Sequence, residues 1–416
     1  MSARNRARSC RLPGGREQRL YTAGSRETRG PALGDNSMRT IVVALAATVI
    51  AAVSLQAQSA GFTIVTVAEG LQDPWAIAAL PDGDLLVTEK AGKLRLIHDG
   101  TLMPDPVPGT PTVRVGGQGG LMDIVLAPDF ATSRYVYMTI AKPNADDSLG
   151  TTAVYRARFD GTRLTDLEEI IATEAWAEAR SHYGTRLTFD DAGHLFLTIA
   201  DRSSFYMTGR PLTEHPAQRL DNHMGKVLRL NMDGSVPADN PFVDTPGALP
   251  EIWTIGHRDP QGIAFRPETG AMWEVEHGPL GGDELNLLTP GRNYGWPIVS
   301  KGGNYLDVTG FHSVPSQEGI EEPVHFWPMS IAPSNIVFYS GKRFPEWRGN
   351  ALISGLVGLR LTRVAFDGDT VTEVETIVDG LGRIRDVHEG PDGSVYIAIT
   401  GGEVAPSPIL RLDPAD

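Results

Sequence analysis

The feature of this sequence that most constrains its fold is a unit that recurs six times along the chain. Each unit begins with a turn rich in Pro, Asp, Asn and Gly, followed by a strand-like segment and, after a gap, a second such segment. Both segments alternate apolar and polar residues and are rich in Val, Ile, Leu and Tyr, which is typical of β-strands. Such self-similarity indicates a repeat fold. The six turns begin at residues 81, 128, 191, 267, 348 and 391.

These units predict an all-β fold over residues 60–416: a single six-bladed β-propeller with four antiparallel strands in each blade. Sheets arranged radially repeat β-units while leaving little exposed strand edge. The last unit lacks a fourth strand after Leu412, and an alternating segment at 62–67 precedes the first unit. We therefore expect the N-terminal strand to complete the last blade. The alternative, a pair of open β-sandwiches, does not explain why the turn recurs six times.

The segment before this domain has the pattern of a secretory signal. Residues 41–53 form a 13-residue apolar run, which is short for a membrane span. A basic start at 38–39 precedes the run and small residues follow it, so we predict a signal peptide at 38–59 and export to the periplasm or the medium. Residues 1–37 are interpreted as an over-called start, or alternatively as a long n-region.

The charge and cysteine content narrow the class of protein further. Without the nine arginines and three acids of residues 1–59, the chain keeps 28 basic and 48 acidic residues, a net charge of −20. This argues against a nucleic-acid partner. The single cysteine, Cys10, excludes Cys-rich zinc sites and would be lost with the leader, which suits an oxidising compartment.

A histidine just before a predicted strand is the first candidate catalytic residue. His182 lies just before a strand-like segment at 187–189, and the pKa of a histidine lies near neutrality, as a general base requires. Asp201 ends the following strand and can orient an imidazole. The alternatives are a loop histidine bonded to a carbonyl and, for Asp201 with Arg202, an exposed ion pair.

Three arginines on separate loops form a second candidate group. Arg258 lies in a turn at 256–262, and Arg383 and Arg385 share one side of a predicted strand because they are two residues apart. Arginine suits bidentate binding of carboxylates. If these loops met, they would form a positive well in an acidic chain, suited to a small planar polycarboxylate. The alternatives are a surface turn for Arg258 and a solvated strand face for the other two.

Three further features point to a bound group. The carbonyls of a Gly278-Pro279 turn, beside carboxylates, suit a hard cation such as Ca²⁺, although there is no EF-hand pattern. Gln118 lies in a glycine-rich stretch that gives backbone room beside its amide. Trp327 can stack on a planar ligand, although a tryptophan there is more often part of the core.

Six stretches, taken together and in order, resemble the soluble PQQ-dependent aldose sugar dehydrogenases of the glucose/sorbosone dehydrogenase family. The resemblance runs from about residue 61 to 416 and implies a six-bladed propeller that holds PQQ at one end of its axis, with Ca²⁺ bridging cofactor and protein. The stretches are 116–121, 182–186, 256–262, 276–284, 293–297 and 382–386.

The same resemblance implies roles for individual residues. His182 would take the proton of the sugar C1 hydroxyl while hydride passes to PQQ, and Asp201 would support that imidazole. Arg258 would stabilise negative charge on the reduced quinone. The implied cofactor contacts are Gln118, Arg383 and Arg385, and the implied Ca²⁺ ligands are the carbonyls of Gly278 and Pro279.

Three departures from the family pattern bear on cofactor affinity. Asp259 stands where the family often has Asn, and Val357 stands where some members carry a cofactor-binding Lys. Both changes remove positive potential near the expected anion, so weaker PQQ binding is expected. Ala200 replaces a common Gly.

These observations lead us to expect an exported dehydrogenase that oxidises aldoses at C1 to lactones. Electrons would pass to a diffusible acceptor or a cytochrome, because the chain has no haem attachment motif of its own. No stable membrane span is expected. The alternatives are a Ca²⁺-dependent sugar lactonase on a similar frame, which would need no PQQ, and a non-catalytic binding propeller.

Overall fold

The computed structural model describes residues 61–203, 211–303, 313–401 and 407–415. The predicted signal peptide at 38–59 and the segment 1–37 lie outside the described residues. In the part of the chain that is described, no helix combines the length and apolarity needed to cross a membrane.

The described residues form six four-stranded antiparallel sheets, which confirms the predicted propeller. From the inner strand outwards, the first three blades are β2 (Pro74–Ala79), β3 (Leu85–Glu89), β4 (Lys93–His98), β5 (Thr101–Leu102); β6 (Leu121–Leu126), β7 (Tyr135–Pro143), β8 (Gly150–Phe159), β9 (Leu164–Ala172); and β10 (Gly184–Phe189), β11 (Leu195–Ile199), β12 (Lys226–Leu230), β13 (Ile252–Ile255).

The other three blades follow in chain order, and the last is completed by the first strand. They are β14 (Pro260–Phe265), β15 (Met272–Glu276), β16 (Asp283–Leu288), β17 (His325–Trp327); β18 (Pro333–Phe338), β19 (Ala351–Gly355), β20 (Leu361–Asp367), β21 (Thr370–Val378); and β22 (Arg383–Glu389), β23 (Val395–Thr400), β24 (Ser407–Pro414), β1 (Phe62–Leu71). Four short helices lie in the loops: α1 (Phe130–Ser133), η1 (Leu212–Glu214), η2 (Pro216–Gln218) and η3 (Pro345–Trp347).

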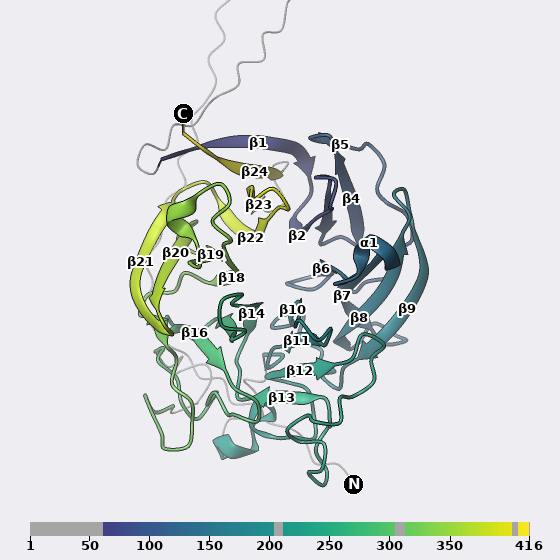
Figure 1. Cartoon of the computed structure of the whole chain (residues 1–416). Coiled ribbons are helices and arrows are strands. Elements are labelled where there is room, and N and C mark those ends of the chain that lie inside the picture. The colour runs from purple at the N-terminus through teal and green to yellow at the C-terminus, as the bar shows by residue number, and fades with distance from the viewer. Residues whose placement is uncertain (1–60, 204–210, 304–312, 402–406, 416) are drawn as a thin grey trace, which may run out of the picture. The chain divides into compact units, whose positions relative to one another are not determined.

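The blades of the described unit form a closed ring (Figure 1). Each innermost strand contacts the innermost strand of the next blade, in the order β2, β6, β10, β14, β18, β22, and β22 contacts β2. The ring closes because β1 pairs antiparallel with β24, with Ile64 opposite Leu412. Phe62 of β1 packs edge-on against Phe344 and Trp347, which lie between β18 and β19, in a core cluster shared by the fifth and last blades. The predicted closure by the N-terminal strand is therefore confirmed.

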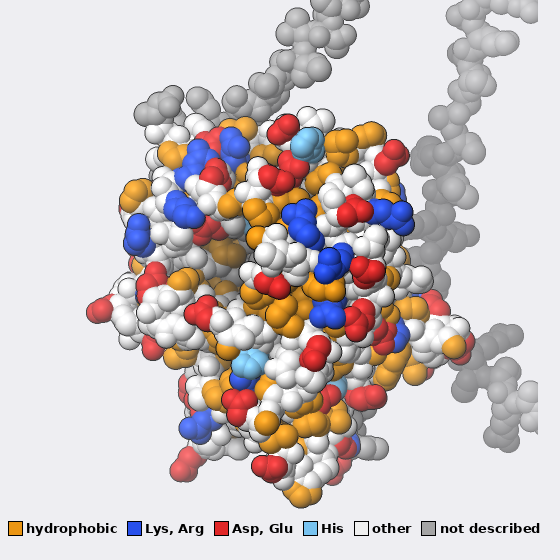
Figure 2. Space-filling model, turned by 45° about the vertical axis from the view of Figure 1, so that its right-hand side comes forward, with side chains coloured by type: hydrophobic (Ala, Val, Ile, Leu, Met, Phe, Trp, Pro, Cys, Tyr) orange, Lys and Arg blue, Asp and Glu red, His pale blue; other side chains and the backbone are white. Residues whose placement is uncertain are grey.

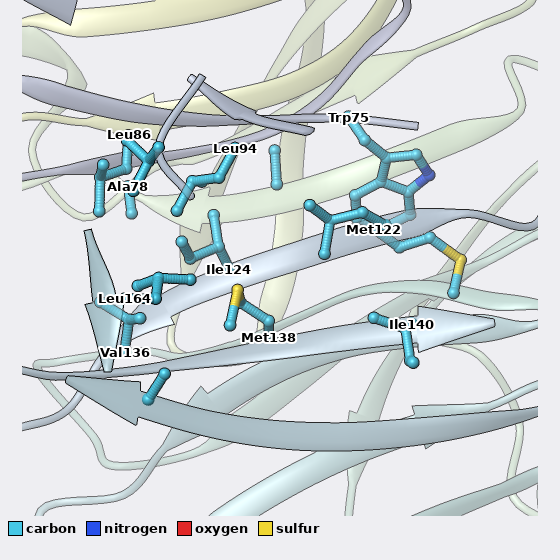
Figure 3. Packing of buried hydrophobic residues seen from close by; sticks show 14 of the residues in the cluster. Trp75, Ala78, Leu86, Leu94, Met122, Ile124, Val136, Met138, Ile140 and Leu164 are labelled. Carbon is cyan, nitrogen blue, oxygen red and sulfur yellow. The ribbon is translucent and has the colours of Figure 1, made fainter. Parts of the chain in front are cut away.

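The hydrophobic core lies largely between neighbouring blades. Figure 3 shows one such cluster, in which apolar side chains of the first blade meet those of the second. Leu86 and Ala78 come from β3 and β2, and Ile124 and Met138 come from β6 and β7; all four are almost completely buried. Because both faces of an inner strand are covered in this way, these strands are buried along most of their length.

Every inner strand has a register shift where it pairs with the second strand of its blade. The six shifts lie near the start of the inner strand, at 74–77, 121–124, 184–187, 260–262, 333–335 and 384–386. A bulge turns the local backbone and redirects side chains. Six bulges at the same position of six blades therefore alter the direction of side chains and carbonyls around one end of the axis.

Candidate active site

The bulges bring together a buried ionic cluster on the propeller axis. Arg186, from the bulge of β10, is 3% exposed and contacts residues of all five other blades. A buried guanidinium of this kind must be satisfied on all sides. Its partners are the carboxylates of Asp123 and Asp386, at 2.9 Å each, the carbonyls of Gln261, Ser334 and Arg385, and the ring of Trp75, 4.3 Å from the guanidinium carbon.

A cavity lies beside this cluster. Three of the residues predicted to bind a cofactor line it, namely Gln118, Arg383 and Arg385. The remaining lining residues are Trp75, Met122, Tyr183, Gly184, Gln261, His277, Ala332 and Leu356.

The cavity carries positive charge. Burial and the neighbouring charges of Arg186 and Arg383 lower the pKa of Arg385 to about 10, so its guanidinium remains charged at neutral pH. Among the described residues, neither Arg383 nor Arg385 has an ion pair or a side-chain hydrogen bond to an acid; the Arg385 guanidinium lies 5.5 Å from the ring centre of Trp75. In contrast, acidic and basic side chains are interspersed over the outer face seen in Figure 2. Two arginines beside a cavity suit a polycarboxylate such as PQQ, and the charges of Asp73 and Asp259 offset part of the charge of Arg385.

His182 lies next to this cavity and is held from three sides. Its Nδ1 lies 2.7 Å from the carboxylate of Asp201, and its backbone N–H donates to the side-chain oxygen of Gln118 at 2.6 Å. The Arg202 guanidinium donates to the carbonyl of His182. Asp201 and Arg202 are both buried, so the structure excludes the exposed ion pair considered above as the alternative.

The surroundings of Asp201 favour its ionised form. Burial acts to raise its pKa, but the neighbouring imidazole of His182 and the charge of Arg258 hold the pKa of Asp201 below its usual value. The backbone N–H of Ser203 and the indole N–H of Trp296 each donate to this carboxylate at 2.8 Å. The ionised form is therefore favoured, and the proton shared with His182 belongs on Nδ1.

Arg258 and Asp259 lie on the other side of the imidazole. Arg258 is buried and donates to the carbonyl of His277 at 3.0 Å, so it is not part of an exposed turn. Asp259 is completely buried, and its Oδ2 lies 3.9 Å from His182 Nε2 and 3.5 Å from His277 Nδ1. Its pKa lies below the usual value: burial opposes this, but the interactions with His182, His277 and Arg258 outweigh it.

The predicted metal turn lines a second, smaller cavity that shares His277 with the first. Gly278 and Pro279 line it together with Glu276 and Glu284. A Cβ at Gly278 would lie 2.2 Å from the carbonyl oxygen of Gly281, so only glycine fits this turn. Closely spaced carbonyls beside carboxylates are the oxygen donors that Ca²⁺ prefers, and the residues present fit that ion.

One predicted site residue, Trp327, is packed into the hydrophobic core and is not among the residues that line the two cavities. Trp327 is 8% exposed, is part of the hydrophobic core of the fourth blade, and packs edge-on against His325 at 4.8 Å. It lines neither cavity in this structure, so its stacking on a planar ligand stays a prediction. The aromatic side chains of Trp75 and Tyr183 do line the larger cavity.

Sequence reasoning missed three residues of this region: Trp75, Arg186 and Trp296. Arg186 and Trp296 lie in two of the stretches that carry the family resemblance, 182–186 and 293–297, which was the available signal. No periodicity marks Trp75, because it is one of several apolar residues in its strand.

Comparison with known proteins supports the resemblance. A family model described as Glucose / Sorbosone dehydrogenase matches residues 71–405. The aldose sugar dehydrogenase YliI of Escherichia coli is 39% identical over 352 residues, which cover 83% of this chain and 91% of the relative. Quinoprotein glucose dehydrogenase B of Acinetobacter calcoaceticus is 27% identical over 420 residues, covering 83% and 86%.

A solved structure shares the architecture along nearly its whole length. The PQQ-bound form of an aldose sugar dehydrogenase from Streptomyces coelicolor superimposes with a TM-score of 0.68 at 25% identity, covering 85% of this chain and 98% of that one.

Proposed function

The chain belongs to the glucose/sorbosone dehydrogenase family, and we propose that it oxidises the C1 hydroxyl of aldose sugars to lactones with PQQ as its cofactor. The observation that carries the proposal is the cavity in which Gln118, Arg383 and Arg385 meet beside His182. PQQ, when bound, supplies a planar quinone that takes up the hydride from C1. Three side chains would hold its carboxylates: the guanidiniums of Arg383 and Arg385 and the amide of Gln118.

His182 would act as the general base. With the Nδ1 proton donated to the ionised carboxylate of Asp201, Nε2 keeps the lone pair that accepts the proton of the C1 hydroxyl. Loss of this proton from the hydroxyl oxygen and of the hydride from C1 leaves the carbonyl group of the lactone. Arg258, buried and close to the imidazole, would stabilise negative charge that develops beside it.

The carbonyls of Gly278 and Pro279 would ligate Ca²⁺ at the wall between the two cavities. His277 lines both cavities and precedes this turn, so an ion there would lie at the edge of the cofactor cavity. The buried carboxylates of the same wall would offset its charge.

We also propose that the enzyme is exported to the periplasm or the medium and passes electrons to a diffusible acceptor or a cytochrome. The apolar run at 41–53 and the cysteine-free acidic remainder of the chain support export.

Reconstitution tests the proposed cofactor. Cofactor-free protein should reduce a dye in the presence of an aldose only after PQQ and Ca²⁺ are added together. The melting temperature should also rise with PQQ concentration, because a ligand that binds only the folded state stabilises it. No dye reduction with any aldose would reject the function, and hydrolysis of sugar lactones by cofactor-free protein would favour a lactonase.

Replacement of the proposed base tests the mechanism. His182→Ala should lower kcat by about 10²- to 10⁴-fold, the usual contribution of a positioned base. Its affinity for PQQ, measured by titration of the cofactor absorbance, should stay within a few-fold of that of the original protein. The matched control is His194→Ala, because His194 pairs with Asp190 at the other end of β10 and β11. Equal activity of the two variants would remove His182 from the mechanism.

A further inference from the structure

Trp296 connects several groups of the candidate site. The residue follows β16 in the chain, is 5% exposed, and lies 95 positions from the aspartate that its side chain contacts. Its indole Nε1 donates to Asp201 Oδ2 at 2.8 Å, and the Arg258 guanidinium lies 5.3 Å from its ring centre. One side chain therefore touches both the partner of the proposed base and the neighbouring cation.

The hydrogen bonds of Asp201 are divided between its two oxygens. Oδ1 lies 2.7 Å from Nδ1 of His182 and accepts the backbone N–H of Ser203 at 2.8 Å, and Oδ2 accepts the indole N–H of Trp296. An indole nitrogen can only donate, and so can a backbone N–H. Obligate donors on both oxygens stabilise the ionised carboxylate and fix its plane, and the proton between Asp201 and His182 is thereby held on the imidazole.

Trp296 is itself rigidly placed. Its backbone N–H donates to the carbonyl of Gly256 at 2.8 Å, and its own carbonyl accepts the side-chain amide of Gln218 at 2.7 Å. The ring of His215 meets the indole edge-on at 6.4 Å. Contacts from the segment before β14 and from the η1–η2 region thus set the direction of the indole N–H before any ligand binds.

We propose that Trp296 is a positioning residue for the reaction: its indole N–H holds the Asp201 carboxylate in the orientation that fixes the proton and the ring plane of His182. The proposal rests on the proposed function only for its effect on catalysis. The effect of Trp296 on the Asp201–His182 pair does not require PQQ and can be measured in the cofactor-free protein.

Trp296→Phe separates the hydrogen bond from the packing. Phenylalanine keeps an aromatic face beside Arg258 but has no N–H, so Asp201 loses one donor while the surroundings stay filled. The matched control is Trp273→Phe, because Trp273 is completely buried in the same blade and its Nε1 has no hydrogen-bond partner among the described residues.

The first measurement is proton NMR of the cofactor-free protein. A hydrogen-bonded imidazole N–H gives a resolved downfield resonance, which is assigned to His182 by its loss in His182→Gln. In Trp296→Phe we expect this N–H to exchange with water about 10- to 100-fold faster, in line with the loss of one hydrogen bond to a charged group. The Trp273→Phe spectrum should retain the original exchange rate. An unchanged exchange rate in Trp296→Phe overturns the proposal.

The second measurement is steady-state kinetics of the PQQ- and Ca²⁺-loaded enzyme. Trp296→Phe should lower kcat about 10- to 100-fold, while KM for the aldose and the affinity for PQQ change less than about twofold. Equal losses in kcat and PQQ affinity would show a general distortion of the cavity and overturn the positioning role. If the original protein shows no aldose oxidation, the proposed function fails, but the NMR comparison still decides what Trp296 does to His182.

A second variant covers the case in which Trp296→Phe does not fold. Gln218→Leu removes the amide that holds the Trp296 carbonyl while leaving the indole in the chain. It should increase the exchange rate of the same imidazole N–H, by less than Trp296→Phe. No increase in this variant contradicts the proposal.

Discussion

At the scale of single residues, the site is built from backbone conformations that side chains rarely adopt. His182, Thr185, Arg202 and Ser203 all have positive φ angles, between 51° and 96°. Such conformations cost about 1–3 kcal/mol each and persist only where the surroundings impose them. Here the surroundings are buried hydrogen bonds, in particular those of the Arg202 guanidinium to the carbonyls of Ser181 and His182. Four of the eleven non-glycine residues with positive φ in the described part of the chain are thus among the residues that place the imidazole.

The ionised state of Asp201 predicts a pH-dependent contribution to stability. Because its pKa in the folded protein lies below the ordinary value of 3.8, its stabilising effect is present above that pH and is lost as pH falls through the folded value. Asp201→Asn should therefore lower the free energy of unfolding by about 1–3 kcal/mol at pH 7. The difference from the original protein should shrink progressively below pH 3.8, as measured by urea unfolding.

The control for this prediction is Asp191→Asn, which removes the same charge from an exposed turn. That variant should have the same free energy of unfolding as the original protein, both at pH 7 and below pH 3.8. If Asp201→Asn lowers the free energy of unfolding as much in acid as at neutral pH, the predicted dependence of stability on the ionisation of Asp201 is contradicted.

At the scale of elements, the inner strands both form the ring and direct charged side chains toward one another on its axis. Their pattern of buried apolar residues predicted them as strands, but the bulge near the start of each strand is what directs Asp123, Arg186 and Asp386 toward one another. Burial, opposed by the charge of Arg186, raises the pKa of both aspartates. The inner strands thus enclose two acids and one arginine whose charges depend on each other.

Arg186→Met should destabilise the protein strongly, by about 3–5 kcal/mol near pH 8, because it leaves two buried acids without their cation. A group whose pKa is raised on folding stabilises the protein at low pH and loses that effect as pH rises through the folded value. Without the arginine the pKa values of Asp123 and Asp386 rise further. The loss in free energy of unfolding caused by Arg186→Met should therefore be smaller at pH 5 than at pH 8. Urea unfolding at the two pH values measures it.

The matched control is Arg219→Met, which removes an arginine paired with Asp221 at the surface. An exposed pair contributes at most about 1 kcal/mol, so this variant should unfold near the original midpoint. If Arg186→Met shows the same deficit at both pH values, the charges of Asp123 and Asp386 do not depend on Arg186.

At the scale of the whole described unit, the ring is held by a contact between the two ends of the domain. β1 is the outer strand of the last blade and pairs with β24, so the edge of β24 is covered. Its Phe62 also fills the core beside Trp347. Loss of this strand would expose a hydrogen-bonding edge and an apolar face at once.

A chain that starts at residue 72 should therefore fail to form a stable monomer. We expect it to aggregate or to be digested rapidly by protease, whereas a chain that starts at residue 61 should be resistant and monodisperse by size-exclusion chromatography. A resistant, soluble protein lacking β1 would show that the ring holds without its closing strand.

The sequence by itself determined the number of blades, the strands, the closing strand and three of the residues that line the cavity, Gln118, Arg383 and Arg385. These features could be predicted because strand periodicity and turn chemistry are local, and because the stretches that carry the family resemblance are contiguous. For the same reason His182, Arg258 and Arg385 could be named in advance as candidate site residues.

Only the tertiary structure decided which residues meet. Trp327 and Trp75 are both tryptophans in strands, but Trp327 enters the core of its blade and Trp75 lines the cavity. The bond from Trp296 to Asp201 joins positions 95 residues apart in sequence. Contacts of this kind depend on how bulges and loops orient side chains around the axis, and that orientation has no period along the chain.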